Sequence, residues 1–457
     1  MTRPDVHKVR FEGRRCGTFP LTWAQKWMWR AVTSQAPRLE RLNVPVVVKV
    51  PSGCDLADVL VAITALMERH EALRTRFTVD ETGTPRQVVT RAGELDVEAR
   101  DAGGEAVGEC AQRLVEELSA VAFTVPELSV RAGVVTSAGV PAFVVLVVFH
   151  MAVDGWSVRI LSEDLAAVLR ASFRGLPYPP DSAIGQPVDR LEYELGAEGK
   201  EASMEAVHHW ERTVARFPAR VLPHSTSPPE TPRFQERCLH SAALTVASRT
   251  LAARHRVTPG TVVLAFFCEL LARRSGNTGC GVLMFSNNRF DDSAAALSGI
   301  MLQSVPIYLQ IEGLSLEERL RQAQRAGLVA GASGQYDPEH VQAMLQDLAR
   351  RTGLRPDLAC GVNLTLPEER ENAVGTTVDS QGTAEEIRRL LPGTRVTRQK
   401  APDWDDMRIY LSAREEPDGM AVALRADTFV LSSAGAVQLL RELERLLAEA
   451  ALDTTHG

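Results

Sequence analysis

The 457-residue sequence lacks the long apolar runs and the basic surplus that mark two large classes of protein. It contains no apolar run of about 18 residues, the length that a membrane helix needs, and residues 1–16 have no apolar core like that of a signal peptide. We therefore expect neither a membrane span nor a secretory leader. Lys and Arg number 51 against 58 Asp and Glu, so the net charge is −7. A general nucleic-acid binder needs a basic surface to neutralise phosphates, so this charge argues against that class.

Paired cysteines are also missing from the sequence. The seven cysteines, an odd number, lie singly along the chain and form no Cys-x-x-Cys motif. Disulfide frameworks and structural zinc sites both need such pairs. The pattern favours reduced thiols in the cytoplasm, and it predicts no metal site.

The size and composition predict a globular enzyme of two lobes. A hydrophobic content of 45% and a charged content of 24% are typical of soluble enzymes, and 457 residues exceed one ordinary core. Predicted strands and helices mix without strict alternation, which favours α+β lobes. A short stretch with Pro177, Pro179 and Pro180 is the candidate boundary, so we predict lobes at 1–176 and 177–457.

The most informative stretch of the sequence is VVLVVFHMAVDGWS, residues 144–157. Val144 to Val148 form a largely β-branched run that predicts a strand buried on both faces. His150 follows at the strand end, and an imidazole there can accept or donate a proton near neutral pH. Asp154 and Gly155 then turn the chain into a predicted helix that begins at Trp156.

A lone histidine is more often a satisfied core residue than a functional one. The spacing His-x-x-x-Asp-Gly-Trp-Ser at a strand-to-helix turn is much rarer by chance, so it favours a functional His150. Gly155 lets the backbone approach a substrate closely, and its N–H is a candidate donor to an oxyanion. Trp156 and Ser157 are expected to pack against and cap the following helix.

This stretch resembles the core motif of the condensation domains of nonribosomal peptide synthetases, His-His-x-x-x-Asp-Gly, often followed by Trp-Ser. Other segments resemble further motifs of that family, in the family's order. They are Pro20–Trp29, Arg69–Phe77, His209–Glu211, Ser286–Arg289, Gly299–Ser304 and Tyr336–Val341. The resemblance covers about the whole chain and is therefore far more specific than a single pattern.

The sequence departs from the family pattern at three places. Phe149 replaces the first histidine of the pair, whereas the second, which the family ties to chemistry, is present as His150. Gln303 and Ser304 stand where Asn-Thr is usual, and Tyr308 stands where an arginine often lies. These changes are compatible with the family's fold, but they do not predict the family's usual acyl donor or acceptor substrate.

The resemblance implies two lobes of chloramphenicol-acetyltransferase topology, which meet in a V with a tunnel between them. It implies that His150 acts either as a base or by orienting the acceptor. It implies that Asp154 forms an ion pair with Arg289 across the lobes; the alternative for Arg289 is a surface charge after a strand. Asn363 aligns with an asparagine near the family's active site; the alternative is a capping or turn residue.

The sequence has no carrier-protein motif (Gly-Gly-x-Ser) and no adenylation motif. By resemblance we expect a stand-alone condensation enzyme that transfers an acyl or aminoacyl group from a carrier-protein thioester to an amine or alcohol. The phosphopantetheine arm then belongs to a peptidyl or acyl carrier protein, the acceptor is free or carried, and no cofactor of the chain's own is implied. The alternatives are a non-catalytic docking protein that recruits a partner, a coenzyme A-dependent acyltransferase and an epimerase.

Overall fold

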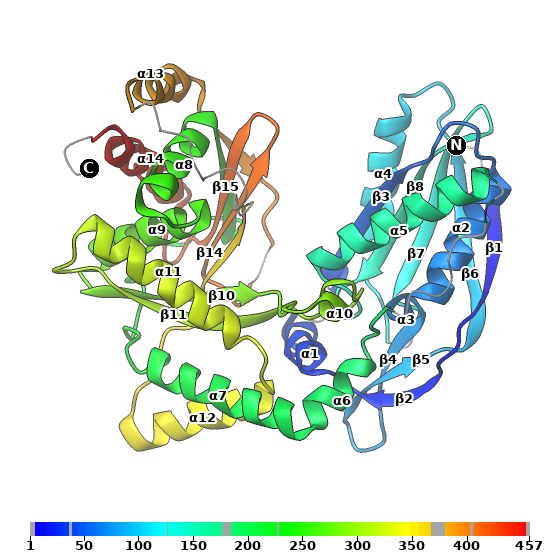
Figure 1. Ribbon diagram of the computed structural model, residues 1–457, viewed down its shortest axis with the longest axis horizontal. Helices are drawn as coiled ribbons and strands as arrows, with labels where there is room; N and C mark the ends of the chain where they lie inside the picture. Colours follow the sequence, from blue (N-terminus) through cyan, green and yellow to red (C-terminus); the bar gives the residue numbers. More distant parts are fainter. Residues whose placement is uncertain are drawn as a thin grey trace. The chain divides into compact units, whose positions relative to one another are not determined.

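The computed structural model describes residues 5–35, 39–125, 127–174, 176, 184–225, 228–366, 380–402 and 405–453. The chain forms two compact units (Figure 1). Unit 1 comprises Met1–Ala202 and Asn287–Gln303, and unit 2 comprises Ser203–Ser286 and Ser304–Gly457. The predicted boundary at 176/177 rests on prolines outside the described residues. In the structure, the first boundary between the units falls inside helix α7 (Ala197–Val214). The later segment Asn287–Gln303 also belongs to unit 1.

Unit 1 is built on a five-stranded sheet in the order β1-β6-β7-β8-β3. Strands β6 and β7 are parallel, and the other neighbours are antiparallel. The strands are β1 (Asp5–Glu12), β3 (Asn43–Lys49), β6 (Ala92–Asp101), β7 (Val130–Ser137) and β8 (Val140–Phe149). A smaller antiparallel sheet consists of β2 (Gly17–Pro20), β4 (Thr75–Val79) and β5 (Pro85–Val89).

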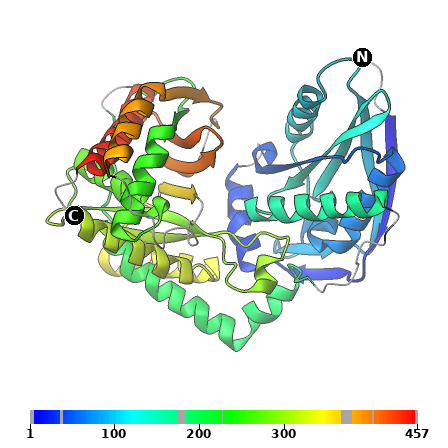
Figure 2. The same ribbon diagram turned by 45° about the horizontal axis from the view of Figure 1, so that its top comes forward.

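Two helices, α2 (Leu56–Arg69) and α5 (Gly155–Phe173), pack against each other and against the large sheet of unit 1, where both views show α5 running across the strands (Figures 1 and 2). Helix α4 (Val107–Ser119) packs on β7 and β8. Further helices of the unit are α1 (Trp23–Gln35), η1 (Leu39–Leu42), α3 (Glu71–Arg74), α6 (Asp189–Leu195) and α10 (Asp292–Ala295). Strand β8 therefore lies inside the apolar core of unit 1.

Unit 2 is built on a seven-stranded sheet in the order β11-β10-β12-β14-β15-β9-β13. Strands β10, β12 and β14 are mutually parallel, and β14, β15, β9 and β13 pair antiparallel. The strands are β9 (Phe234–Ser241), β10 (Gly279–Ser286), β11 (Gln303–Gln310), β12 (Cys360–Thr365), β13 (Arg395–Gln399), β14 (Ile409–Glu416) and β15 (Gly419–Asp427).

Helices α8 (Ala242–His255), α9 (Pro259–Ser275), α11 (Leu316–Ala332) and α14 (Ser433–Leu452) cover the sheet of unit 2 and enclose a second apolar core. The remaining helices are α12 (Pro338–Thr352), α13 (Ser380–Leu390) and η2 (Leu391–Gly393). The predicted α+β class is confirmed, because both units mix helices with mainly antiparallel strands. In the described part of the chain, no helix is long and apolar enough to span a membrane.

Candidate functional site

Strand β8 delivers His150 to the rim of the core of unit 1, as the sequence predicts. Val144 to Phe149 are 0–3% exposed, whereas His150 is half-buried. The backbone N–H of His150 donates to the carbonyl of Leu42 at 2.7 Å, and the ring Nδ1 lies 2.8 Å from the carbonyl oxygen of Val153. A carbonyl only accepts, so Nδ1 carries the proton of the neutral imidazole. The lone pair is thereby left on Nε2, which is able to accept a proton.

Asp154 is the N-cap of α5 and fixes the turn that follows His150. Its Oδ1 accepts the N–H of Ser157 at 3.1 Å, and its own N–H reaches Ser157 Oγ at 3.4 Å, which completes a capping box. The hydroxyl of Ser157 also accepts the N–H of Gly299 at 3.0 Å. Ser157 thus has the capping role predicted for it, and it additionally ties α5 to the segment around Gly299.

Arg289 forms a two-point ion pair with Asp154. Nη1 donates to Oδ2 at 2.8 Å and Nη2 to Oδ1 at 3.0 Å, and the side chains are 1% and 3% exposed. The backbone N–H of Met301 adds a third bond to Oδ2 at 3.0 Å. A buried pair needs further hydrogen bonds to offset its lost hydration, and the Asp154 carboxylate has them from the N–H groups of Ser157 and Met301. The predicted pair is therefore present, and the alternative of a surface charge is wrong.

The prediction that this pair crosses between lobes is corrected by the structure. Arg289 belongs to the segment Asn287–Gln303, which groups with unit 1. Backbone groups hold the segment there, since the carbonyl of Ala295 accepts from Trp156 Nε1 at 2.9 Å and the N–H of Met301 donates to Asp154 Oδ2 at 3.0 Å. The ion pair is thus internal to one compact unit.

Trp156 and Gly155 occupy the exposed first turn of α5. Trp156 is 36% exposed, and the guanidinium of Arg159 lies 4.7 Å from the centre of its ring. A Cβ built on Gly155 would meet no described atom within 4 Å apart from its chain neighbours and the backbone of its own helix, so the backbone is open at this point. These contacts agree with a packing role for Trp156, and the oxyanion role of Gly155 stays a prediction.

Phe149, the departure from the family motif, points into the core. Strand β8 ends at Phe149, and His150 lies in the turn that follows. The Phe149 ring is stacked on Phe123 with centroids 5.4 Å apart, and it meets Phe77 edge-on at 6.2 Å. The phenylalanine therefore lies in the apolar core at the end of β8, directly before His150.

Asn363 lies in unit 2, in the middle of β12 opposite Ser412 of β14. Burial raises the pKa of Tyr410 on β14, and a hydrogen bond from Asn363 opposes that rise. Asn363 is thus a strand residue bonded to a neighbouring tyrosine, so the alternative of a capping or turn asparagine is wrong. Its predicted place near the active site stays a prediction.

The motif Arg69–Phe77 contacts α5, the helix that begins beside His150, through Asp164. Arg69 Nε and His70 Nε2 each lie 2.8 Å from Asp164 Oδ2 on α5, and Leu73 and Phe77 are buried in the core. Burial lowers the pKa of His70. Burial also acts to raise the pKa of Asp164, but the bonds and charges of His70 and Arg69 outweigh it and lower that pKa to about 2. The sequence pattern did not indicate Asp164, which lies 94 residues from His70.

The sequence also did not predict the backbone groups that hydrogen-bond around Asp154. The N–H of Met301 and both backbone groups of Gly299 complete the network around Asp154, and a backbone donor leaves no mark in a sequence pattern. Within the described ranges, no group of three or more His, Cys, Asp or Glu side chains could hold a metal ion.

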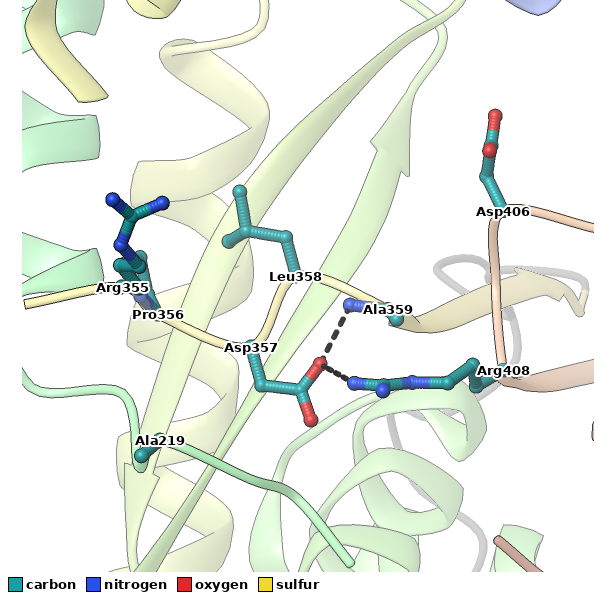
Figure 3. Close-up of a pocket in the computed structure, with 8 residues that line it drawn as sticks. All are labelled: Ala219, Arg355, Pro356, Asp357, Leu358, Ala359, Asp406 and Arg408. Atoms are coloured by element: carbon teal, nitrogen blue, oxygen red, sulfur yellow. Dashed lines mark hydrogen bonds and ion pairs between the residues drawn. The ribbon is translucent and has the colours of Figure 1, made fainter. Parts of the chain in front are cut away.

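Figure 3 shows a pocket of about 440 Å³ in unit 2, where β12 and β14 begin, and none of the predicted site residues lines it. Its central carboxylate, Asp357, already accepts from Arg408 at 2.7 Å, from the N–H of Ala359 at 3.1 Å and from the N–H of Val221 at 3.0 Å. These bonds give Asp357 a structural role at the start of the two strands.

Comparisons with known proteins agree with this geometry. The family model described as "Condensation domain" matches residues 16–456. The chain is 28% identical over 339 residues, 70% of its length, to "Probable non-canonical nonribosomal peptide synthetase (NRPS) CymA" from Salinispora arenicola. It is 28% identical over 346 residues, 72% of its length, to "Isonitrile lipopeptide synthase" from Mycobacterium tuberculosis. The chain spans only 4% and 14% of these two relatives.

Among solved structures, the chain is similar to one titled "Molecular basis for condensation domain-mediated chain release from the enacyloxin polyketide synthase". The TM-score is 0.74 at 20% identity, and the match covers 98% of this chain and 84% of the other. This likeness confirms the predicted two-lobed fold of the chloramphenicol-acetyltransferase type. Motif order, the geometry at the end of β8 and a family match over nearly the whole length lead to one conclusion: the chain belongs to the condensation domain family.

Proposed function

We propose that the protein forms an amide or ester bond by moving an acyl or aminoacyl group from a carrier-protein thioester to an amine or alcohol. The observation that carries the proposal is His150 with Nδ1–H held by the carbonyl of Val153 at 2.8 Å. An imidazole fixed in this tautomer has its basic lone pair on Nε2, which suits it to take the proton of an attacking nucleophile.

In the proposed reaction, the acceptor nitrogen or oxygen attacks the thioester carbonyl. His150 Nε2 takes the acceptor's proton, the carbon–sulfur bond breaks, and the proton passes to the departing thiolate of the phosphopantetheine arm. General-base assistance of this kind is worth about 10²–10⁴-fold in rate. The arm belongs to the carrier, so the chain needs only to bind and orient it.

Asp154 and Arg289 have a positioning role in this proposal. Both oxygens of Asp154 are already bonded to Arg289, Ser157 and Met301, and the residue is buried. It therefore has no oxygen to offer a substrate, and it acts by fixing the turn between His150 and α5. The exposed backbone at Gly155 is the proposed donor to the tetrahedral oxyanion.

The test is turnover of a panel of acyl groups presented in trans on a carrier protein and on coenzyme A, each with amine and alcohol acceptors. Wild type is compared with His150→Ala and with the control His208→Ala, an exposed histidine on α7. Carrier-dependent product that is lost only in His150→Ala supports the proposal. Equal turnover from coenzyme A indicates a coenzyme A-dependent acyltransferase. Carrier binding without product in any pairing indicates a recruitment protein.

A further inference from the structure

The Phe149 side chain belongs to an aromatic stack that is capped by a cation. Phe149 is 3% exposed and is stacked on Phe123 with 25° between the rings, and Phe77 meets it at 77°. Phe77 comes from the motif Arg69–Phe77, in β4, and Phe123 from the loop after α4. The guanidinium carbon of Arg131 lies 4.0 Å from the centre of the Phe123 ring, within the range of a cation–π contact.

Arg131 also fixes the loop that carries Phe123. It donates to the carbonyls of Val121 at 2.6 Å and Ala122 at 2.8 Å. Asn43 Nδ2 donates to the same Val121 carbonyl at 2.8 Å. Asn43 pairs with Phe149 in the β3–β8 register, so the loop is bonded both to the cation above the stack and to the strand beside Phe149.

The backbone of Phe149 anchors the turn that holds His150. Its N–H donates to the carbonyl of Ser129 at 2.8 Å, and its carbonyl accepts the N–H of Ala152 at 2.8 Å. Val153 follows Ala152 directly, and its carbonyl is the acceptor for His150 Nδ1 at 2.8 Å. Movement of Phe149 would therefore move the acceptor that sets the tautomer of His150.

We propose that the stack of Phe77, Phe123 and Phe149 under Arg131 is the positioning device for His150 in this chain. It holds the 149–153 turn so that Nδ1–H stays on the Val153 carbonyl and Nε2 keeps the lone pair. The expected effect on turnover rests on the proposed function. The expected effect on the tautomer of His150 can be measured without turnover.

The proposal explains why phenylalanine is suited to the position. The ring neighbours of Phe149, Phe77 and Phe123, offer no hydrogen-bond acceptor, so an imidazole there would lose its hydration without compensation. Phenylalanine gains from ring stacking and from apolar burial at the same place. A histidine restored at this position is thus expected to loosen the turn.

The test compares Phe149→Leu and Phe149→His with Phe11→Leu, a matched loss of a buried phenylalanine in β1, at the edge of the same sheet. Long-range ¹H–¹⁵N NMR of the neutral imidazole reports the tautomer of His150. We expect the Nδ1–H tautomer in wild type and Phe11→Leu, and a mixture of tautomers in both Phe149 variants. Arg131→Met, which keeps the aliphatic stem, is expected to give a smaller shift in the same direction.

Turnover supplies the second readout. We expect kcat of Phe149→Leu to fall about 10-fold with KM nearly unchanged, because a misplaced general base loses part of its advantage. Phe149→Tyr, which retains the ring, is expected to recover most of the loss if it folds to the wild-type melting temperature. An unchanged tautomer and kcat in Phe149→Leu, with stability lowered as in Phe11→Leu, would overturn the proposal. An inactive wild type would contradict the proposed function. The tautomer measurement would still show whether the aromatic stack positions His150.

Discussion

Two arginine–aspartate ion pairs, one in each unit, differ in how far the arginine is exposed to solvent. Arg289 and Asp154 in unit 1 are both buried, with side chains 1% and 3% exposed. In unit 2, Arg233 pairs with Asp427 at 2.6 Å, but Arg233 is 52% exposed while Asp427 is fully buried. Because Arg233 is half exposed, water can take over part of its hydrogen bonding to the aspartate. Arg289 is buried, so water cannot do the same there. The pair next to His150 is therefore the one that the protein cannot lose.

The sharpest way to break this comparison is to remove each arginine in turn. Arg289→Met leaves the buried Asp154 charge with hydrogen bonds but without its cation, which costs about 3–5 kcal/mol. Arg233→Met is expected to cost about 1 kcal/mol, since its own charge is half in solvent and Asp427 keeps the N–H of Phe429 at 3.0 Å. Urea unfolding measures both. Equal costs would show that burial of the cation does not distinguish the pairs.

A double substitution sharpens the same comparison. Asp154→Leu with Arg289→Met removes both charges, so it is expected to regain most of the stability lost in Arg289→Met alone, on the order of 2–4 kcal/mol. Turnover is expected to stay lost, because Asp154 also caps α5 and ties it to Met301. Recovery of turnover together with stability would show that the pair contributes only to folding.

A further prediction concerns acid, through the other carboxylate of α5. The pKa of Asp164 is lowered to about 2, against 3.8 ordinarily, and burial lowers the pKa of His70. Both groups bind protons more readily in the unfolded chain, so stability falls with falling pH: first below about 6.5 through His70, then between about 4 and 2 through Asp164. His70→Gln should flatten the upper part of the denaturation profile. An unchanged slope between pH 7 and 5 would contradict the assignment.

A small effect, similar to that of Arg233→Met, is expected at Ser157. Ser157→Ala keeps the N–H that Asp154 accepts and loses the hydroxyl between Asp154 and Gly299, so the cost is about 1 kcal/mol. The measurement is the melting temperature together with kcat, for which we expect a modest loss. Ser172→Ala, which removes a hydroxyl bonded to Asp58 at the other end of α5, is the control for a loss of stability without a loss of kcat.

The sequence predicted those parts of the site that side chains specify. The β-branched run before His150 predicted a buried strand, and the family resemblance predicted the ion pair of Asp154 with Arg289. It could not predict that the segment of Arg289 joins unit 1, since the bonds that hold it use backbone groups of Ala295, Gly299 and Met301. Nor could it pair His70 with Asp164, because the fold brings α5 against the junction of α2 and α3, where His70 lies.

The insertion of Asn287–Gln303 into unit 1 has a consequence for the order in which the molecule is made. A ribosome that has completed residues 1–202 has made the strands of the first sheet but not the cation that neutralises Asp154. That cation emerges only after strand β10 of unit 2 has been synthesised. Unit 1 therefore reaches its final form late, and the ion pair of Asp154 with Arg289 is among the last parts of it to be completed.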